Sequence, residues 1–183
     1  MTYLKLLTTF TLIFSSLGLA DVGAEEVRFK MGWNYKNFPF AVKLYEVPPT
    51  SPLWSMASVK SLPKELILKE IPDNLLIAHK GRRNKFALVI HNTSNQVQYF
   101  FASPHSAEPA EHSIGFKYNC LCMNHSFKIQ PNSYWYRTVE LRVSNKYEAP
   151  PKSKPLEITH DIIGLDVAKG KLLQDTKLPE SEK

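Results

Sequence analysis

The amino-acid sequence predicts an all-β fold, a sandwich of about seven or more short antiparallel strands. Short segments in which apolar and polar residues alternate recur along the chain, which is the pattern of half-buried strands. The connections between them are polar or contain some of the 13 prolines, residues typical of turns. No stretch shows helical periodicity of useful length. The strands therefore have to bury their apolar faces against one another, in two packed layers.

The first strands are expected soon after the start of the mature chain. Large apolar residues alternate with polar residues and glycine over 27–33, and a similar but shorter pattern covers 40–44. A proline-rich connection follows over 50–63 and contains Trp54. The segment 65–71 is short and apolar, and fits either a strand or one helical turn before a turn at 72–74.

The middle of the chain predicts a β-hairpin. Large apolar residues occupy every second position over 86–91 and again over 97–101. The polar segment 92–96 between them is typical of a turn. Because the two segments are adjacent in the chain, we expect them to pair. The remaining expected elements are a loop at 102–113, a strand at 114–122, a strand at 135–143, a loop at 145–155 and a last strand at 156–162.

The first twenty residues have the features of an export signal. Lys5 supplies a positive charge, and 6–19 is apolar apart from small hydroxyl residues and Gly18. Small residues permit cleavage after Ala20 or Ala24. The apolar run is shorter than the ~20 residues that span a bilayer, so cleavage is favoured over the alternative, an uncleaved membrane anchor. Either outcome predicts an exported, periplasmic protein.

Residues 25–166 are expected to form a single β-sandwich domain, and the charged segment 167–183 a flexible tail. The formal net charge of +6 is spread along the chain, and only 80–83 is a dense basic cluster. A basic turn of this size is usually solvated, so no nucleic-acid partner is predicted. Two cysteines in an exported chain of this length exclude a disulfide-rich scaffold.

The sequence does not predict an enzyme. No nucleophile motif surrounds any serine, there is no glycine-rich phosphate loop, and the carboxylates are too scattered to suggest an acid–base pair. The four-ligand cysteine pattern of a zinc site is also absent.

The chemistry of the chain is concentrated at its two cysteines. Cys120 and Cys122 continue the period of two set by Ile114, Phe116 and Tyr118, which places both sulfurs on one face if the strand stays regular. Two thiolates form a soft ligand set, which favours Cu(I) over hard cations. The sequence therefore predicts a copper site on a secreted β-domain.

Two neighbouring residues are candidates for further ligands. His125 follows the turn-forming Asn124, which favours its reaching the same site. Met123 points away from the cysteines in a regular strand and joins only if the chain turns there. His105 and His112 are weaker candidates from the preceding loop. The remaining histidines are expected to be structural or solvent-exposed, namely His79, His91 and His160.

Two alternatives remain open for the cysteines themselves. A cysteine is often a small buried apolar residue with no ligand. A Cys120–Cys122 disulfide is also an option in an exported chain, although extended residues at i and i+2 lie roughly 7 Å apart at Cα, near the limit for a bridge. Such a bridge would enclose almost no loop and would stabilise the fold little.

The order of features resembles the copper chaperones of cytochrome c oxidase assembly of the CtaG type. That family has a Cys-Phe-Cys-Phe hallmark after an aromatic-Asn-Lys-Ile-like run, and this chain has FKYNCLCM at 116–123. An Asn-x-Ser/Thr turn upstream corresponds to 90–94 here. A Pro-Gly-Glu turn into a strand corresponds to the turn at 130–133 and the segment 134–143. A closing strand corresponds to 156–163.

The resemblance covers about 61–166 and implies an immunoglobulin-like β-sandwich. It further implies that Cys120 and Cys122 bind Cu(I) for delivery to the CuB centre of the oxidase, with copper bridging two protomers as one arrangement. Leu121 and Met123 replace the two family phenylalanines, and a further family cysteine has no counterpart here.

Two other functions are kept as alternatives. Cys120, His125 and Gln130 have the C-x4-H-x4-Q spacing of the copper loop in stellacyanin-type electron carriers, with His91 as the upstream imidazole. A metal-free protein-interaction module is the third possibility. It would use some of the aromatic residues, most of which are expected in the core, at Trp33, Tyr35, Phe38, Phe40, Trp54, Trp135 and Tyr136.

Overall fold

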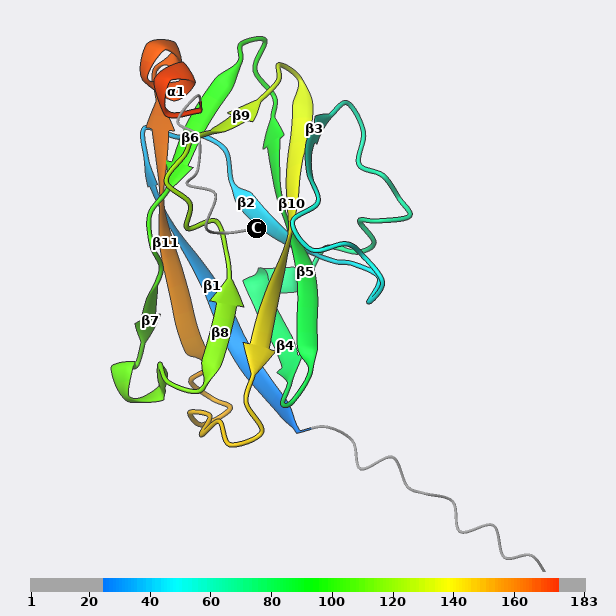
Figure 1. Ribbon diagram of the computed structural model, residues 1–183, viewed down its shortest axis with the longest axis vertical. Coiled ribbons are helices and arrows are strands. Elements are labelled where there is room, and N and C mark those ends of the chain that lie inside the picture. The colour runs from blue at the N-terminus through cyan, green and yellow to red at the C-terminus, as the bar shows by residue number, and fades with distance from the viewer. Residues whose placement is uncertain (1–24, 175–183) are drawn as a thin grey trace, which may run out of the picture.

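The computed structural model describes residues 25–174, which form two β-sheets packed face to face (Figure 1). This arrangement confirms the predicted all-β sandwich. The expected export signal with its two cleavage sites, and the end of the expected tail, lie outside the described residues. Among residues 25–174, no helix is long and apolar enough to cross a bilayer.

The first sheet has the strand order β4-β1-β11-β6-β9, and β7 also pairs with β11. Strands β1 and β11 run parallel, and all other neighbours in this sheet are antiparallel. The strands are β1 (Glu26–Lys36), β4 (Leu75–His79), β6 (Gln98–Ala102), β7 (Ser106–Glu108), β9 (Phe127–Ile129) and β11 (Leu156–Leu165).

The second sheet is antiparallel throughout, with the order β2-β5-β10-β3, and β8 also pairs with β10. Its two longest strands, β5 and β10, lie side by side in the centre. The strands are β2 (Val42–Glu46), β3 (Met56–Val59), β5 (Arg83–Asn92), β8 (Phe116–Asn119) and β10 (Ser133–Val143).

The main hydrophobic core lies between the sheets, because alternate residues of each strand point inward. Phe29 and Ile158 contribute to it from the first sheet, and Leu88 and Trp135 from the second. A second apolar cluster lies on the outer face of the second sheet, under the long connection that follows β2. Its buried members are Val47, Ile67, Ala87, Val89 and Tyr136.

Each sheet has a divided edge. Strands β6 and β7 lie end to end along one edge of β11, paired with 162–165 and 157–159 respectively. Strands β3 and β8 lie end to end along one edge of β10. In Figure 1, β7 and β8 occupy the lower half of the view, and β6, β9 and β3 the upper half. Both divided edges therefore leave an interruption between an upper and a lower strand.

The chain crosses from the second sheet to the first between β8 and β9. This crossover, residues 120–126, contains both cysteines. Because β8 and β9 belong to different sheets, the crossover bridges the two divided edges.

The predicted hairpin of 86–91 with 97–101 is wrong. Strand β5 belongs to the second sheet and β6 to the first, so the connection between them arches across the sandwich. The buried Asn92 amide group holds this arch by donating to the Gln96 carbonyl, at 2.8 Å, and the Gln130 carbonyl, at 3.0 Å. Apolar residues on both segments face the shared core from opposite layers.

Strands β3 and β7 lie in segments that were expected to be loops, and β4 and β9 lie in segments for which the sequence predicted no element. The segment 65–71 begins in a turn and is otherwise irregular, and it forms neither a helix nor a strand, although Glu70 makes an isolated bridge with Tyr45. Short 3-10 turns lie at Pro72–Asn74 (η1) and Ala110–His112 (η2).

A short helix, α1 (Val167–Gln174), begins the segment that was expected to be a flexible tail. Its Gly170 is buried beside Tyr99 of β6, and the Gly170 carbonyl accepts a 2.6 Å hydrogen bond from the Ser126 hydroxyl. The helix is therefore packed on β6 and joined to the end of the crossover.

Candidate metal centre

The two cysteines lie in a turn after β8 has ended at Asn119, so the expected regular strand through Cys122 is wrong. The Met123 N–H donates a 2.7 Å hydrogen bond to the Leu121 carbonyl, which closes a tight turn. Leu121 is fully buried in the main core and anchors this turn. The turn shortens the Cys120–Cys122 Cα distance to 5.5 Å, well below the roughly 7 Å of an extended segment.

Cys120 and Cys122 are joined by a disulfide in this structure. The bent backbone removes the geometric objection to a bridge between residues so close in sequence. This is the oxidised form of the pair, whereas a metal is bound by thiolates. Metal binding through both sulfurs therefore requires two-electron reduction of this disulfide.

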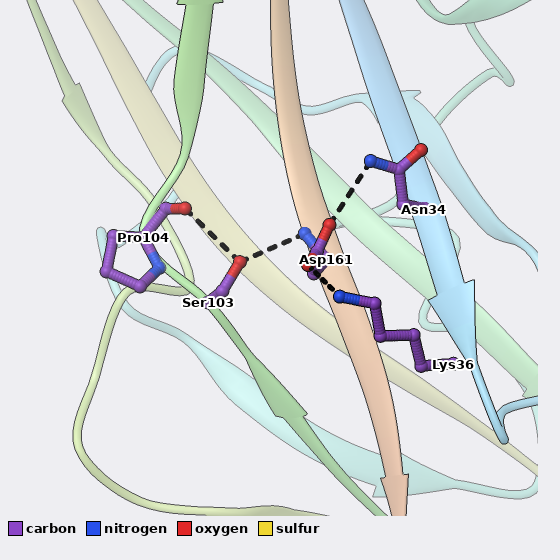
Figure 2. Close-up of polar contacts among 5 residues, drawn as sticks. All are labelled: Asn34, Lys36, Ser103, Pro104 and Asp161. Carbon is purple, nitrogen blue, oxygen red and sulfur yellow. Dashed lines mark hydrogen bonds and ion pairs between the residues drawn. The ribbon is translucent and has the colours of Figure 1, made fainter.

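His105 lies at the interruption between β6 and β7. Just before it, the Ser103 N–H donates to the Asp161 carbonyl, and the Ser103 hydroxyl accepts from the Asp161 N–H, both at 3.0 Å. Figure 2 shows this hydroxyl reaching β11, with the Asp161 carboxylate bonded to Asn34 and Lys36 of β1. Pro104 has no N–H to continue the pairing. The chain is thus fixed to β11 immediately before His105.

His160 comes from the neighbouring position of β11 and points to the opposite face from Asp161. It is 0% exposed. Its ring stacks on Trp33, with ring centroids 5.4 Å apart, because the two residues are register partners in the parallel β1–β11 pair. The β-strand alternation therefore directs this imidazole into the sandwich.

The four side chains converge on one point. The Nδ1 atom of His105 lies 3.4 Å from the Cys122 Sγ and 3.5 Å from the Cys120 Sγ. The Nε2 atom of His160 lies 3.6 Å from the Cys122 Sγ. All four donor atoms lie within 4.8 Å of one another. This Cys2His2 cluster is a possible metal site.

Both imidazoles are held in the form that binds metals. Burial lowers the pKa of His105, and burial together with the nearby His105 lowers the pKa of His160 to about 3. Both rings are consequently neutral at neutral pH, with a lone pair available for a metal. The Nδ1 atom of His160 is buried and has no hydrogen-bond partner among the described residues.

The centre has an open side. Cys120 is 6% exposed, whereas Cys122 is exposed. Both sulfur-bearing residues and His105 line a cleft of about 610 Å³. The sulfurs are therefore not sealed in hydrocarbon, and a ligand has a route to them. The other residues that line the cleft are Trp54, Met56, Lys117, Tyr118, Asn119, Met123, His125 and Arg137.

The two further ligands expected from the sequence lie beside the cluster. His125 lines the cleft, and its ring packs on Phe127 with centroids 4.9 Å apart. Met123 also lines the cleft and packs partly against the main core. Neither belongs to the group of four converging donors. Their participation as ligands stays a prediction.

The ligand set expected for an electron carrier is not brought together. His91 stacks on Tyr134, with ring centroids 4.0 Å apart, and lies outside the four-residue cluster. His112, a weaker candidate for the predicted copper site, is also outside the four-residue cluster, with its Nδ1 atom 2.8 Å from the Glu148 carbonyl oxygen. The exposed Gln130 donates its backbone N–H to the Ser58 hydroxyl.

From the sequence, His105 is a weak candidate ligand and His160 is expected to be structural or exposed. A signal for His160 was present, since it occupies an inward position in the apolar series of Leu156, Ile158 and Ile162. No local signal distinguished His105, because its place depends on pairing with β11, more than fifty residues later in the chain.

Comparison with curated proteins and with solved structures finds no match to this chain. A family model matches residues 27–165, a span that runs from β1 to the end of β11 and contains all four residues of the cluster. The matched span is well over half of the 183 residues. The chain therefore belongs to the family described as a domain of unknown function, DUF8709.

Proposed function

We propose that this chain is an extracytoplasmic Cu(I)-binding protein that delivers copper to a copper enzyme. Reduced Cys120 and Cys122 hold the ion, with His105 and His160 completing the site. One observation carries the proposal: two sulfurs and two neutral imidazoles from three separate segments lie within 4.8 Å beside an open cleft.

The donor set and its exposure favour Cu(I). Thiolates are soft ligands that select Cu(I), and imidazole is compatible with it. A Cys2His2 set also suits zinc, but structural zinc sites are closed on all sides. Here Cys122 is exposed and both cysteines line the cleft. Such a site suits an ion that is taken up and passed on.

The direct test is a titration of the reduced, oxygen-free protein with Cu(I) in competition with a chromophoric Cu(I) chelator. We expect one tightly bound, colourless Cu(I) per chain, and loss of this binding in the variant that combines Cys120→Ser with Cys122→Ser. His112→Gln is the matched control, because it removes a histidine outside the cluster. Unchanged Cu(I) binding by the double variant, or a preference for Zn(II) over Cu(I), would overturn the proposal.

Two further variants decide whether the residues nearest in sequence take part. His125→Gln and Met123→Leu each remove one of the sequence-predicted ligands while keeping a side chain of similar size. If the four converging donors suffice, both variants keep the Cu(I) affinity of the unmodified protein. A tenfold or larger loss in either variant would add that residue to the ligand set.

Delivery is tested separately from binding. The Cu(I)-loaded protein is mixed with the metal-free soluble domain of a copper enzyme, and copper in each protein is measured after separation. The resemblance described above makes a cytochrome c oxidase subunit the first acceptor to try. Measurement of molar mass with and without Cu(I) shows whether copper bridges two protomers. Failure of transfer to any copper enzyme would leave a copper-binding protein without a delivery role.

One observation also favours an electron carrier as the second candidate. Cys122 lies within 3.6 Å of ring nitrogens of both His105 and His160, and blue copper sites combine one thiolate with two imidazoles. An intense visible band on addition of Cu(II) would support it. The adjacent Cys120 favours a different result, in which two thiolates reduce two Cu(II) ions to Cu(I) and form the disulfide.

A further inference from the structure

Strand β10 places one charged side chain on the inner face of its sheet. Arg137 follows the inward-facing Trp135 and precedes the inward-facing Val139 in the alternating series. It is 4% exposed. Charged residues are almost never buried to this extent unless an opposite charge accompanies them.

No anion accompanies Arg137 in the described part of the chain. The ion pairs of residues 25–174 all involve other side chains, and the Arg137 Nε is buried without a hydrogen-bond partner. The guanidinium carbon lies 4.6 Å from the ring centroid of Trp54 and 5.5 Å from that of Phe127. Aromatic contacts of this kind attract the cation but leave its in-plane N–H donors without acceptors.

Arg137 lies in the wall of the cleft that leads to the metal centre, and the cleft has the composition of an anion site. Lys117 is a second cation there, and none of the described residues that line the cleft is an aspartate or a glutamate. Its volume of about 610 Å³ falls within the 300–1,000 Å³ typical of small-molecule sites. Trp54 and Met56, which are 45% and 47% exposed, provide apolar surface.

We propose that this cleft binds a small organic carboxylate. The carboxylate pairs with the in-plane N–H donors of Arg137, a geometry that the planar guanidinium provides for planar oxyanions. The apolar body of the ligand lies against Trp54 and Met56. The volume of the cleft exceeds what an inorganic ion alone needs, which favours an organic ligand.

The test uses the oxidised, metal-free protein, in which the disulfide keeps both cysteines from contributing negative charge. Acetate, succinate, benzoate and inorganic phosphate are titrated separately, and the Trp54 indole N–H and Arg137 Nε–H signals are followed by NMR. We expect saturable shifts of both signals, with succinate or benzoate binding at least tenfold more tightly than phosphate. Arg137→Met is expected to abolish saturation, and Arg82→Gln, in an exposed turn, to leave it unchanged.

Three results would overturn the inference: no saturable shift with any carboxylate, equal affinity for phosphate and the organic acids, or undiminished binding by Arg137→Met. Arg137→Lys keeps the charge but not the fork of donors, and is expected to weaken binding at least tenfold. Arg137→Lys replaces Arg137→Met as the test if the methionine variant does not fold. Carboxylate binding by the variant with both cysteines replaced by serine separates this inference from the copper proposal, since that variant should keep it.

Discussion

His160 is a residue whose surroundings disfavour the charged form and leave even the neutral form incompletely satisfied. It is fully buried, its pKa is lowered to about 3, and its Nδ1 atom has no partner in the described structure. A buried polar atom without a hydrogen bond costs about 1–3 kcal/mol. An apolar residue of similar size at this position should therefore cost the sandwich little stability, and the proposed metal centre would give the imidazole a function.

His160→Leu should therefore have opposite effects on the stability of the protein and on its Cu(I) binding. The free energy of unfolding should stay constant or rise by about 1 kcal/mol, because the unpartnered polar atom is removed. Cu(I) affinity should fall at least ~10-fold, since even second-sphere changes at metal sites cost that much. Chemical denaturation measures the free energy of unfolding, and competition with a chelator measures the Cu(I) affinity. A stability loss above about 2 kcal/mol with intact Cu(I) affinity would assign His160 a purely structural role.

Tyr147 predicts an alkaline limit to stability. Burial raises the pKa of its phenol to about 12, against about 10 in an unfolded chain. Between these values the unfolded state loses the proton and the folded state keeps it, so stability declines as pH rises from 10 to 12. Tyr147→Phe should reduce the decline by about 2 kcal/mol in denaturation experiments at pH 12. At pH 7 the variant should be at least as stable as the unmodified protein, because the buried hydroxyl has no partner among the described residues. An unchanged alkaline slope would contradict this account.

At the scale of the elements, the interruption between β6 and β7 decides where His105 lies. The Ser103 hydroxyl takes the place of a backbone carbonyl in accepting the Asp161 N–H (Figure 2). Ser103→Ala should lower the free energy of unfolding by about 1 kcal/mol. It should also weaken Cu(I) binding, since His105 follows two residues later. Ser106→Ala, on the exposed face of β7, is the control. Equal effects of the two substitutions would show that the hydroxyl does not position His105.

Helix α1 depends on the absence of a side chain at Gly170. A Cβ atom there would lie 2.3 Å from the Tyr99 Cγ and 2.5 Å from its Cβ, so Gly170→Ala requires the helix to move away from β6. Overpacking of this kind typically costs about 1–3 kcal/mol. Hydrogen exchange should become faster in α1 and at Ser126, which bonds to Gly170. The exposed Lys169→Ala should raise neither rate, and equal rates in both variants would refute the close contact.

For the molecule as a whole, the disulfide should contribute little to stability. It links residues two apart and restricts almost no loop in the unfolded chain. The metal-free variant with both cysteines changed to serine should therefore unfold within about 2 kcal/mol of the oxidised protein. Cu(I) should act differently, raising Tm of the reduced protein by mass action. At a free Cu(I) concentration 100 times the Kd, the gain is about 2.7 kcal/mol. A reduced protein that is unfolded without copper would contradict the first expectation.

The strands that are long and regularly alternating were predictable from sequence. β1, β10 and β11 have ten or eleven residues, and their core-facing series is visible without a structure. Four strands were not predictable in this way, β3, β4, β7 and β9, which have three to five residues and owe their conformation to a neighbouring strand. The hairpin error has a related cause, because alternation identifies a buried face but not the sheet to which the strand belongs.

The candidate site was predictable in part for the same physical reason. The Cys120–Cys122 pair is local and visible in the sequence, and its sulfurs do converge. The two imidazoles reach them through pairings of β6 and β7 with β11, which no local pattern records. Arg137 is visible in the sequence as a charge in an inward-facing series, yet the lack of a counter-ion for it among residues 25–174 appears only in three dimensions.

The two divided edges have a consequence for the uptake and release of a metal ion. Because the crossover that carries both cysteines lies where both edges are interrupted, an ion bound by the four converging side chains would enter from the edge of the sandwich. Entry of an ion along this edge would break no backbone hydrogen bonds between the central strands. Uptake and release of such an ion would then require movement of the turn at residues 120–126 alone, with the pairing within both sheets preserved.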